Sequence, residues 1–122
     1  MQQHIVNKDK FGSEHRLLRV DGFDRVVKAG NLVDKYLKLF FAENRKKNAR
    51  LGIVASKRVF PRAVDRNRAK RLIREVFRQH SIKQKKLDMV VMLRHACSLQ
   101  PGLQRQNLET LFSRLESRCA DF

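Results

Sequence analysis

The residues whose types and spacing could do chemistry are concentrated between Arg62 and His80. This stretch holds seven Arg or Lys and two acids, a surplus of five positive charges that pairing within a helix cannot neutralise. Guanidinium groups donate paired hydrogen bonds to phosphate oxygens, and an exposed asparagine can hydrogen-bond a ribose or a nucleic-acid backbone. The composition of this stretch therefore predicts that it binds a polyanion.

The same stretch has the periodicity of an amphipathic α-helix. One stripe is apolar and must pack against the rest of the domain: Ala69, Leu72, Ile73, Val76 and Phe77. The roughly opposite side carries a basic ladder with neighbours beside it and near the N-terminal end: Lys70, Arg74 and Arg78, then Asn67 and Arg71, then Arg66 and Arg68. We expect this side to be the binding surface. A merely solvated face is the alternative, and Asn67 could instead act only as a local cap.

Residues suited to catalysis or metal binding are scattered. A two-metal nuclease needs clustered carboxylates, yet the twelve acids include no Asp or Glu pair at the spacing that such a site needs. Cys97 and Cys119 form no CxxC motif, and the four histidines never fall three or four residues from one another or from a cysteine. Ser56 has no evident base beside it, so a sheet-filling role is favoured over a nucleophile. We expect no metal held by protein ligands alone.

Length and charge set the class of protein. The 122 residues favour one domain over residues 1–122, with a basic arm at 1–14 and a tail at 119–122. A net charge of +16 with 42% hydrophobic residues is typical of a folded nucleic-acid binder, whose partner supplies the counter-charge. No apolar run reaches the roughly 20 residues of a membrane span, and no targeting segment is evident. We therefore predict a cytoplasmic protein that does not bind membranes.

The elements before the basic helix begin with a short helix. Asp21 is its expected cap, Gly30 is its expected stop, and three apolar residues share one face: Phe23, Val26 and Val27. From 32 to 43 the pattern has period two, which predicts one strand. Leu37, Leu39 and Phe41 point to one face, and Tyr36, Lys38 and Phe40 to the other. The second face suits stacking of a base beside a phosphate-binding cation; the alternative is that Tyr36 and Phe40 pack under a helix.

The remaining elements follow in order. The polar, Asn-containing segment 44–50 predicts a hairpin tip, with residues 51–56 as the return strand. Residues 88–93 are a nearly continuous apolar run, which predicts a central strand buried on both faces. A last amphipathic helix is expected from Leu103 to about Arg118.

Several of these segments together resemble the bacterial ribonuclease P protein component. The stretch Arg66-Asn67-Arg68-Ala69-Lys70-Arg71-Leu72-Ile73-Arg74-Glu75-Val76-Phe77 is similar to the RNR signature of that family. It is preceded by Ser56-Lys57-Arg58 and followed by Asp88-Met89-Val90-Val91. The helix at 23–30 fits the first helix of the family. The resemblance covers most of the chain in the right order.

The resemblance implies a fold and a partner. The implied fold is an α+β sandwich with a four-stranded mixed sheet, three helices and a left-handed βαβ crossover, of the type in the second domain of ribosomal protein S5. General connection rules favour the right-handed form, so handedness comes from the family alone. The implied partner is a catalytic RNA in a 1:1 complex with monomeric protein. That complex removes the 5′ leader from precursor tRNA with Mg²⁺ held mainly by the RNA, so the protein alone is not expected to be catalytic.

The resemblance also implies residue roles. The matched catalytic-RNA-binding positions are Arg66, Asn67, Arg68, Lys70, Arg71 and Arg74. The matched leader-binding positions are Phe23, Phe40, Ser56, Lys57 and Arg58, to which Tyr36 and Lys38 are added because they share the strand face of Phe40. Two departures are Val27, where many relatives have an aromatic residue, and Phe60-Pro61-Arg62, where many have a glycine-containing turn.

Three other classes of function compete with this interpretation. A structural rRNA-binding protein would be equally small and basic, and only the RNR stretch and the aromatic strand face favour the ribozyme subunit over it. An autonomous nuclease lacks the clustered acids. A sequence-specific DNA reader would use the basic helix, yet no helix of fitting length precedes it.

The mechanism expected for the ribozyme subunit is electrostatic. Basic residues lower the repulsion between two RNAs, so that magnesium sites on the RNA fill at lower free magnesium.

Overall fold

The computed structural model describes residues 15–17, 22–34, 37–94 and 105–120. Helix α2 spans Phe23–Val27, and strands β1, β2 and β3 span Gly30–Val33, Leu37–Glu43 and Arg50–Val54. Helix α3 (Ala63–Gln79), the short 3₁₀ helix η4 (Ser81–Gln84), strand β4 (Leu87–Leu93) and helix α4 (Arg105–Arg118) complete the chain. The two long amphipathic helices expected from the sequence are confirmed as α3 and α4. The 1–14 arm, Asp21, Tyr36, Cys97 and Leu103 lie outside the described residues.

The four strands form one mixed sheet in the order β1-β2-β4-β3. Strand β2 pairs with β1 and with β4 in the antiparallel sense, and β3 pairs with β4 in the parallel sense. Every residue of β4 except Met92 is buried. The prediction that residues 88–93 form a central strand is therefore confirmed.

The predicted hairpin between 32–43 and 51–56 is wrong in two respects. The period-two segment is two strands, β1 and β2, because Asp34 and Leu37 close a turn through their backbone groups (N···O 2.9 Å) and the Asp34 carboxylate accepts the Leu37 N–H (3.1 Å). Strands β2 and β3 do not pair, because β4 lies between them. A strand with apolar residues on both faces is best buried with a neighbour on each side, and β4 takes that place.

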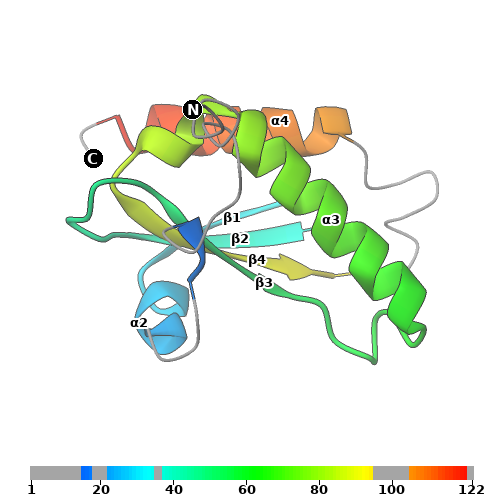
Figure 1. Ribbon diagram of the computed structural model, residues 1–122. Coiled ribbons are helices and arrows are strands. Elements are labelled where there is room, and N and C mark those ends of the chain that lie inside the picture. Colours follow the sequence, from blue (N-terminus) through cyan, green and yellow to red (C-terminus); the bar gives the residue numbers. More distant parts are fainter. Residues whose placement is uncertain (1–14, 18–21, 35–36, 95–104, 121–122) are drawn as a thin grey trace, which may run out of the picture.

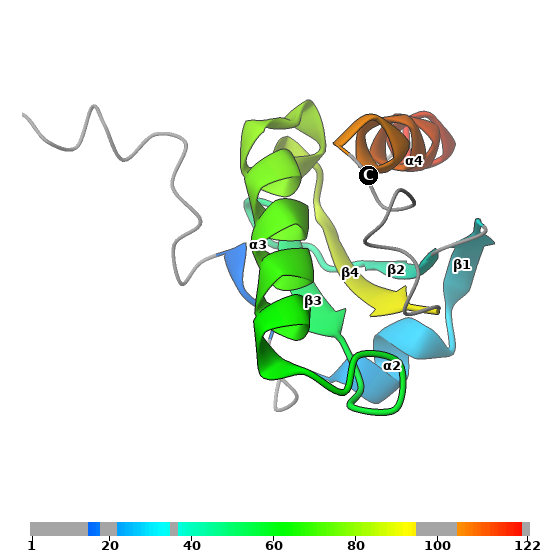
Figure 2. The same ribbon diagram turned by 90° about the vertical axis from the view of Figure 1, so that its right-hand side faces the viewer.

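Helices cover both faces of the sheet (Figures 1 and 2). Helices α3 and α4 lie on one face, where Phe77 and Phe112 join Leu39 and Val91 in the main core. Helix α2 lies on the other face. In both views the path β3–α3–β4 is a left-handed crossover, as the resemblance implies and against the usual preference.

Helix α2 is only five residues long and depends on packing for its stability. Its N-cap is Gly22 at φ 95°, not Asp21, and Gly30 begins β1 instead of ending the helix. Val26 is buried. The ring of Phe23 lies against Gly52 of β3, where an added Cβ would come 2.4 Å from Phe23 Cζ. Gly52 is therefore required for the aromatic ring to lie over the strand.

Candidate nucleic-acid interface

The burial of one side of α3 fixes which side chains face solvent. Ala69, Ile73, Val76 and Phe77 are buried in the main core, as the sequence predicts, while Leu72 is partly buried. The helix begins at Ala63 after an extended Arg62, and Asp65 in the first turn is favourably placed at the positive end of the helix dipole. With the apolar stripe held in this way, the basic ladder is turned outward.

The outward side of α3 carries a shallow hollow of about 400 Å³, which we call the α3 hollow. The residues that line it are Asn67, Lys70, Arg71, Arg74, Glu75 and Arg78. Four of the residues matched to catalytic-RNA-binding positions are thus brought together with Arg78, the last residue of the predicted basic ladder, and with Glu75, which was not predicted to lie on this surface. Arg68 is exposed nearby on the same helix. A concentration of cations with one acid is suited to binding phosphate groups.

Arg66 differs from the other motif residues. Its NH1 group donates to the carbonyl oxygens of Phe60 (2.8 Å) and Pro61 (3.1 Å), so the guanidinium holds the loop that leads into α3. Phe60 belongs to the same loop and packs its side chain into the main core, with 2% of its surface exposed. Sequence periodicity could not show this role, because it depends on where the loop carbonyls lie.

The loop held by Arg66 contains the predicted leader-binding residues Ser56, Lys57 and Arg58. The Ser56 carbonyl accepts the Phe60 N–H (2.9 Å), and the Ser56 hydroxyl accepts the Val59 N–H (3.3 Å). These bonds close a turn that leaves Lys57 and Arg58 exposed. The Ser56 hydroxyl therefore serves the turn. Ser56 is exposed and lies beyond the end of β3 at Val54, so the predicted sheet-filling role and the predicted return strand to residue 56 are wrong.

A second hollow of about 500 Å³ follows β3, which is an edge strand of the sheet; we call it the edge hollow. The residues that line it include Leu17, Phe23, Gly52, Ser56, Lys70 and Arg74. Two of the predicted leader-binding residues, Phe23 and Ser56, thus lie in one hollow with an apolar floor. Its basic residues are Arg16, Lys70 and Arg74, of which Lys70 and Arg74 also line the α3 hollow.

The predicted stacking face of β2 is covered. Phe40 is 7% exposed and packs with Leu17, Val26 and Val90. Lys38, half-buried, places its Nζ 5.1 Å from the centroid of the Phe40 ring. The alternative left open by the sequence, that Phe40 packs under a helix, is the one the structure bears out, and Phe40 is not placed to stack a base.

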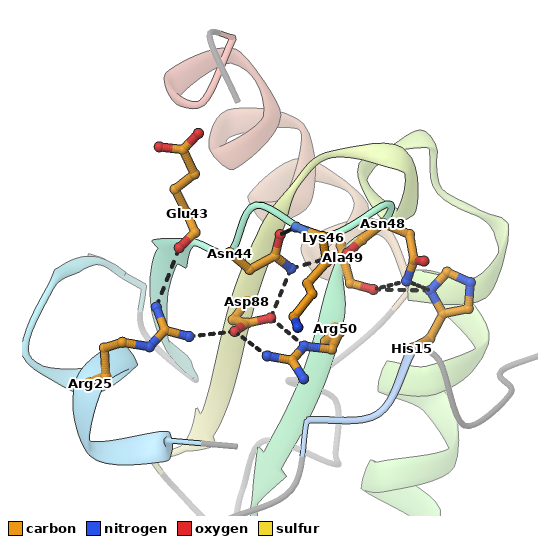
Figure 3. Close-up of polar contacts among 9 residues, drawn as sticks. All are labelled: His15, Arg25, Glu43, Asn44, Lys46, Asn48, Ala49, Arg50 and Asp88. Carbon is orange, nitrogen blue, oxygen red and sulfur yellow. Dashed lines mark hydrogen bonds and ion pairs between the residues drawn. The ribbon is translucent and has the colours of Figure 1, made fainter.

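A buried carboxylate lies at the loop end of the sheet (Figure 3). Asp88 is fully buried and accepts bonds from Arg50 Nε and NH2 (2.8 Å each), Asn44 Nδ2 (2.9 Å) and Arg25 NH2 (2.5 Å). Burial would raise the pKa of Asp88, but the bonds from Arg50 and Asn44, the charge of Arg50 and the bond from Arg25 outweigh it and lower the pKa. The sequence did not reveal this cluster, because it forms only when Arg50 and Asp88 pair across parallel strands.

The same cluster fixes the loop between β2 and β3. Asn44 and Ala49 donate their N–H groups to the carbonyls of Lys86 and Lys83 (3.1 and 2.9 Å), and His15 Nδ1 lies 3.0 Å from the Ala49 carbonyl. Figure 3 shows Asn44, Asn48 and His15 beside this loop, with Asn44 bonded to Asp88. Within the described residues, no group of three or more His, Cys, Asp or Glu could hold a metal ion. The described helices include none long and apolar enough to cross a membrane.

Comparison with known proteins gives consistent matches. The model of the family described as Ribonuclease P matches residues 11–116. The chain is 40% identical over 108 residues to the ribonuclease P protein component of Thioalkalivibrio sulfidiphilus, covering 87% of this chain and 90% of that one. It is 34% identical over 116 residues to that of Pseudoalteromonas atlantica, covering 94% of each.

Solved structures show the same similarity. The RNase P protein of Staphylococcus aureus superposes with a TM-score of 0.73 at 30% identity, covering 84% of this chain and 95% of that one. The RNase P protein of Thermotoga maritima superposes with a TM-score of 0.69 at 29% identity, covering 84% and 96%. The fold and the sequence therefore point to one family.

Proposed function

The chain belongs to the bacterial ribonuclease P protein family, and from that premise we propose that its two hollows bind two different RNAs. As a member it is the protein subunit of ribonuclease P, takes part in tRNA processing and has the ribonuclease P RNA as its partner. The α3 hollow, with Arg68 beside it, binds this catalytic RNA. The edge hollow binds the single-stranded 5′ leader of precursor tRNA.

The assignment of α3 rests on one observation: its basic side is exposed while its apolar side is buried. Asn67, Arg71 and Arg74 are exposed, and Lys70 is half-buried beside them. Guanidinium and ammonium groups in this arrangement bind phosphates without reading sequence, which suits the backbone of a folded RNA. Arg66 supports the surface indirectly, because it fixes the loop at the start of α3.

The assignment of the edge hollow rests on its combination of an aromatic ring, an apolar floor and basic residues. Phe23 is half-buried, and the Cζ and Cε1 atoms of its ring lie against Gly52, so the ring is held in this hollow. A base can stack on Phe23 while Lys70 or Arg74 binds a neighbouring phosphate. Lys57 and Arg58 extend the positive charge beyond Ser56. Phe40 takes no part in stacking, and its role is to pack the sheet under α2.

The protein assists cleavage through electrostatics and positioning. Its cations reduce the repulsion between catalytic RNA and precursor tRNA, so magnesium ions bound mainly by the RNA are retained at lower free magnesium. The carboxylate of Asp88 is fully engaged by Arg25, Arg50 and Asn44, so it does not serve as a metal ligand. One protein acts per RNA, and the complex works in the cytoplasm.

Reconstitution tests the proposal. A bacterial ribonuclease P RNA is assayed for precursor-tRNA cleavage across a magnesium titration, alone and with this protein. The protein should lower the magnesium concentration needed for half-maximal cleavage. The double substitution R68A/R71A should lose most of this effect, whereas R114A, which removes an exposed charge from α4, should retain it. Equal curves with and without protein would contradict the proposal and favour a structural RNA-binding role.

A further inference from the structure

The basic side of α3 continues beyond the motif. Arg78 lies four residues after Arg74, which places it one turn further along the same side of the helix. It lines the α3 hollow together with Lys70, Arg71 and Arg74. The hollow is therefore not confined to the residues of the RNR signature, and its far end is formed by Arg78 and Glu75.

Glu75 is in an unexpected place for an acid. It lines a hollow whose other charged lining residues are all cations, so its carboxylate repels any phosphate bound there. Its contacts explain what it does. Nε of Arg78 donates to Glu75 Oε1 at 2.8 Å, and NH2 of the same guanidinium donates to the same oxygen. Because both bonds end on one oxygen, they fix which edge of the guanidinium faces Glu75.

The ion pair contributes little to the stability of the helix. The side chains of Arg78 and Glu75 are 27% and 40% exposed, and an exposed pair three residues apart stabilises a helix only weakly. Orientation of Arg78 is the larger consequence, because the edge of the guanidinium that carries Nε and NH2 faces Glu75 and the NH1 side faces away from it.

The end of α3 is also modified electrostatically. The C-terminal end of a helix carries partial negative charge that repels anions. Lys83 Nζ donates to the carbonyl oxygen of Arg78 at 2.8 Å, and its positive charge offsets the partial negative charge of that carbonyl. This end of α3 therefore repels an anion less than a helix end without such a donor.

We propose that the catalytic-RNA surface extends one turn past Arg74 to Arg78, and that Glu75 is a positioning residue that orients the Arg78 guanidinium toward an RNA phosphate. This inference rests on the proposed role of α3. Its consequence is a reversal of sign: neutralising an acid on an RNA-binding surface ordinarily strengthens binding, but here it weakens binding.

The test measures the affinity of full-length variants for ribonuclease P RNA over a salt series. E75Q should weaken binding roughly threefold to tenfold although it removes a negative charge from the surface. R78A should weaken binding by a similar factor and reduce the salt slope by about 0.7 to 0.9, the loss of one phosphate contact. In the R78A background, E75Q should no longer weaken binding. E109Q is the matched control, since it removes a glutamate ion-paired to an arginine on α4 (4.0 Å) and should not weaken binding.

The outcomes separate the inference from the proposed function. Tighter binding by E75Q would show that Glu75 is only a repulsive charge and would overturn its positioning role. An unchanged salt slope for R78A would show that the RNA surface ends before this residue. R68A is included in the same series: if it also fails to change affinity and slope, the proposed role of α3 itself fails. Thermal unfolding of each variant confirms that the fold is retained.

Discussion

Replacement of Asp88 by asparagine should destabilise the fold strongly while leaving the shape of the side chain unchanged. The carboxylate is fully buried and accepts four hydrogen bonds, three of them from guanidinium groups. An amide offers only one oxygen, and its NH2 group would face donors of Arg50. The substitution therefore leaves at least one buried donor without an acceptor.

The magnitude follows from the exposure of each partner. The two bonds from Arg50, whose side chain is 17% exposed, account for most of the loss, since a bond to a charged group contributes about 1.5 to 3 kcal/mol. The bond from Arg25, whose side chain is 47% exposed, contributes less than about 1 kcal/mol. Removal of a buried charge recovers part of the desolvation cost. We expect D88N to lower the free energy of unfolding by about 2 to 4 kcal/mol.

The sign of the pH dependence gives a second criterion. The pKa of Asp88 is lower in the folded protein than its ordinary value, so its stabilising contribution is complete above about pH 4 and is lost as the pH falls through the folded pKa. The difference between wild type and D88N should therefore be large at pH 7 and should shrink in strong acid.

Urea unfolding followed by circular dichroism, at pH 7 and at a series of acid pH values, measures this difference. E109Q, which disrupts an exposed ion pair on α4, is the control and should change the free energy of unfolding by less than about 0.5 kcal/mol. A D88N protein as stable as this control at pH 7, or a difference that does not narrow in acid, would refute the reasoning.

Three further predictions separate side chains that hold the fold from those that bind RNA. R66A should lower the free energy of unfolding by about 1 to 2 kcal/mol because the loop carbonyls lose their donor, whereas R68A should weaken RNA binding without changing the melting temperature. F23A should weaken binding of precursor tRNA by about 1 to 3 kcal/mol and leave mature tRNA unaffected. F40A should instead cost about 3 to 5 kcal/mol of stability; equal losses of binding for the two tRNAs, or a stable F40A, would contradict these roles. Burial lowers the pKa of His80, although the charges of Glu116 and Glu109 act to raise it, and its Nδ1 accepts the Ile82 N–H. As the pH falls from neutral toward the folded pKa, the unfolded chain binds a proton at this residue more readily than the folded protein. Wild type should therefore lose more stability over this pH range than H80Q does, as parallel melts measure.

The elements that the sequence predicts well are those with a local signal. The apolar stripe of α3 and the continuous apolar run of β4 identify their structure and burial without knowledge of their neighbours. The hairpin prediction failed because strand pairing is not local: 44–50 joins consecutive strands, yet both of them pair with β4, which is a distant segment. Which of two plausible partners a strand takes depends on the whole sheet.

The candidate site shows the same division. Alternation along β2 correctly placed Phe40 opposite Leu39, but it could not say that Leu17 and α2 would cover that face. The charge of Arg66 was evident, while the direction of its side chain depends on two carbonyls in a preceding loop. Asp88 acquires its partners only through the register of β3 on β4. Residue type can thus be read from sequence, but the partner of a long polar side chain depends on tertiary contacts.

The two hollows have a consequence that neither has alone. Lys70 and Arg74 line both of them, whereas Arg71 lines only the α3 hollow and Phe23 only the edge hollow. Lys70 and Arg74 therefore form a ridge between the two hollows. A leader and a catalytic RNA bound at the same time would share the two cations of this ridge, so each RNA would partly neutralise the charge that attracts the other. Binding at the two hollows also places the two RNA backbones close together. Their mutual repulsion is largest when both are bound, and the charge of the ridge then has its largest effect. We therefore expect K70A to weaken both affinities and to raise the magnesium requirement of the ternary complex more than R71A or F23A does. A K70A protein whose defect is confined to one RNA would show that the two sites are electrostatically independent.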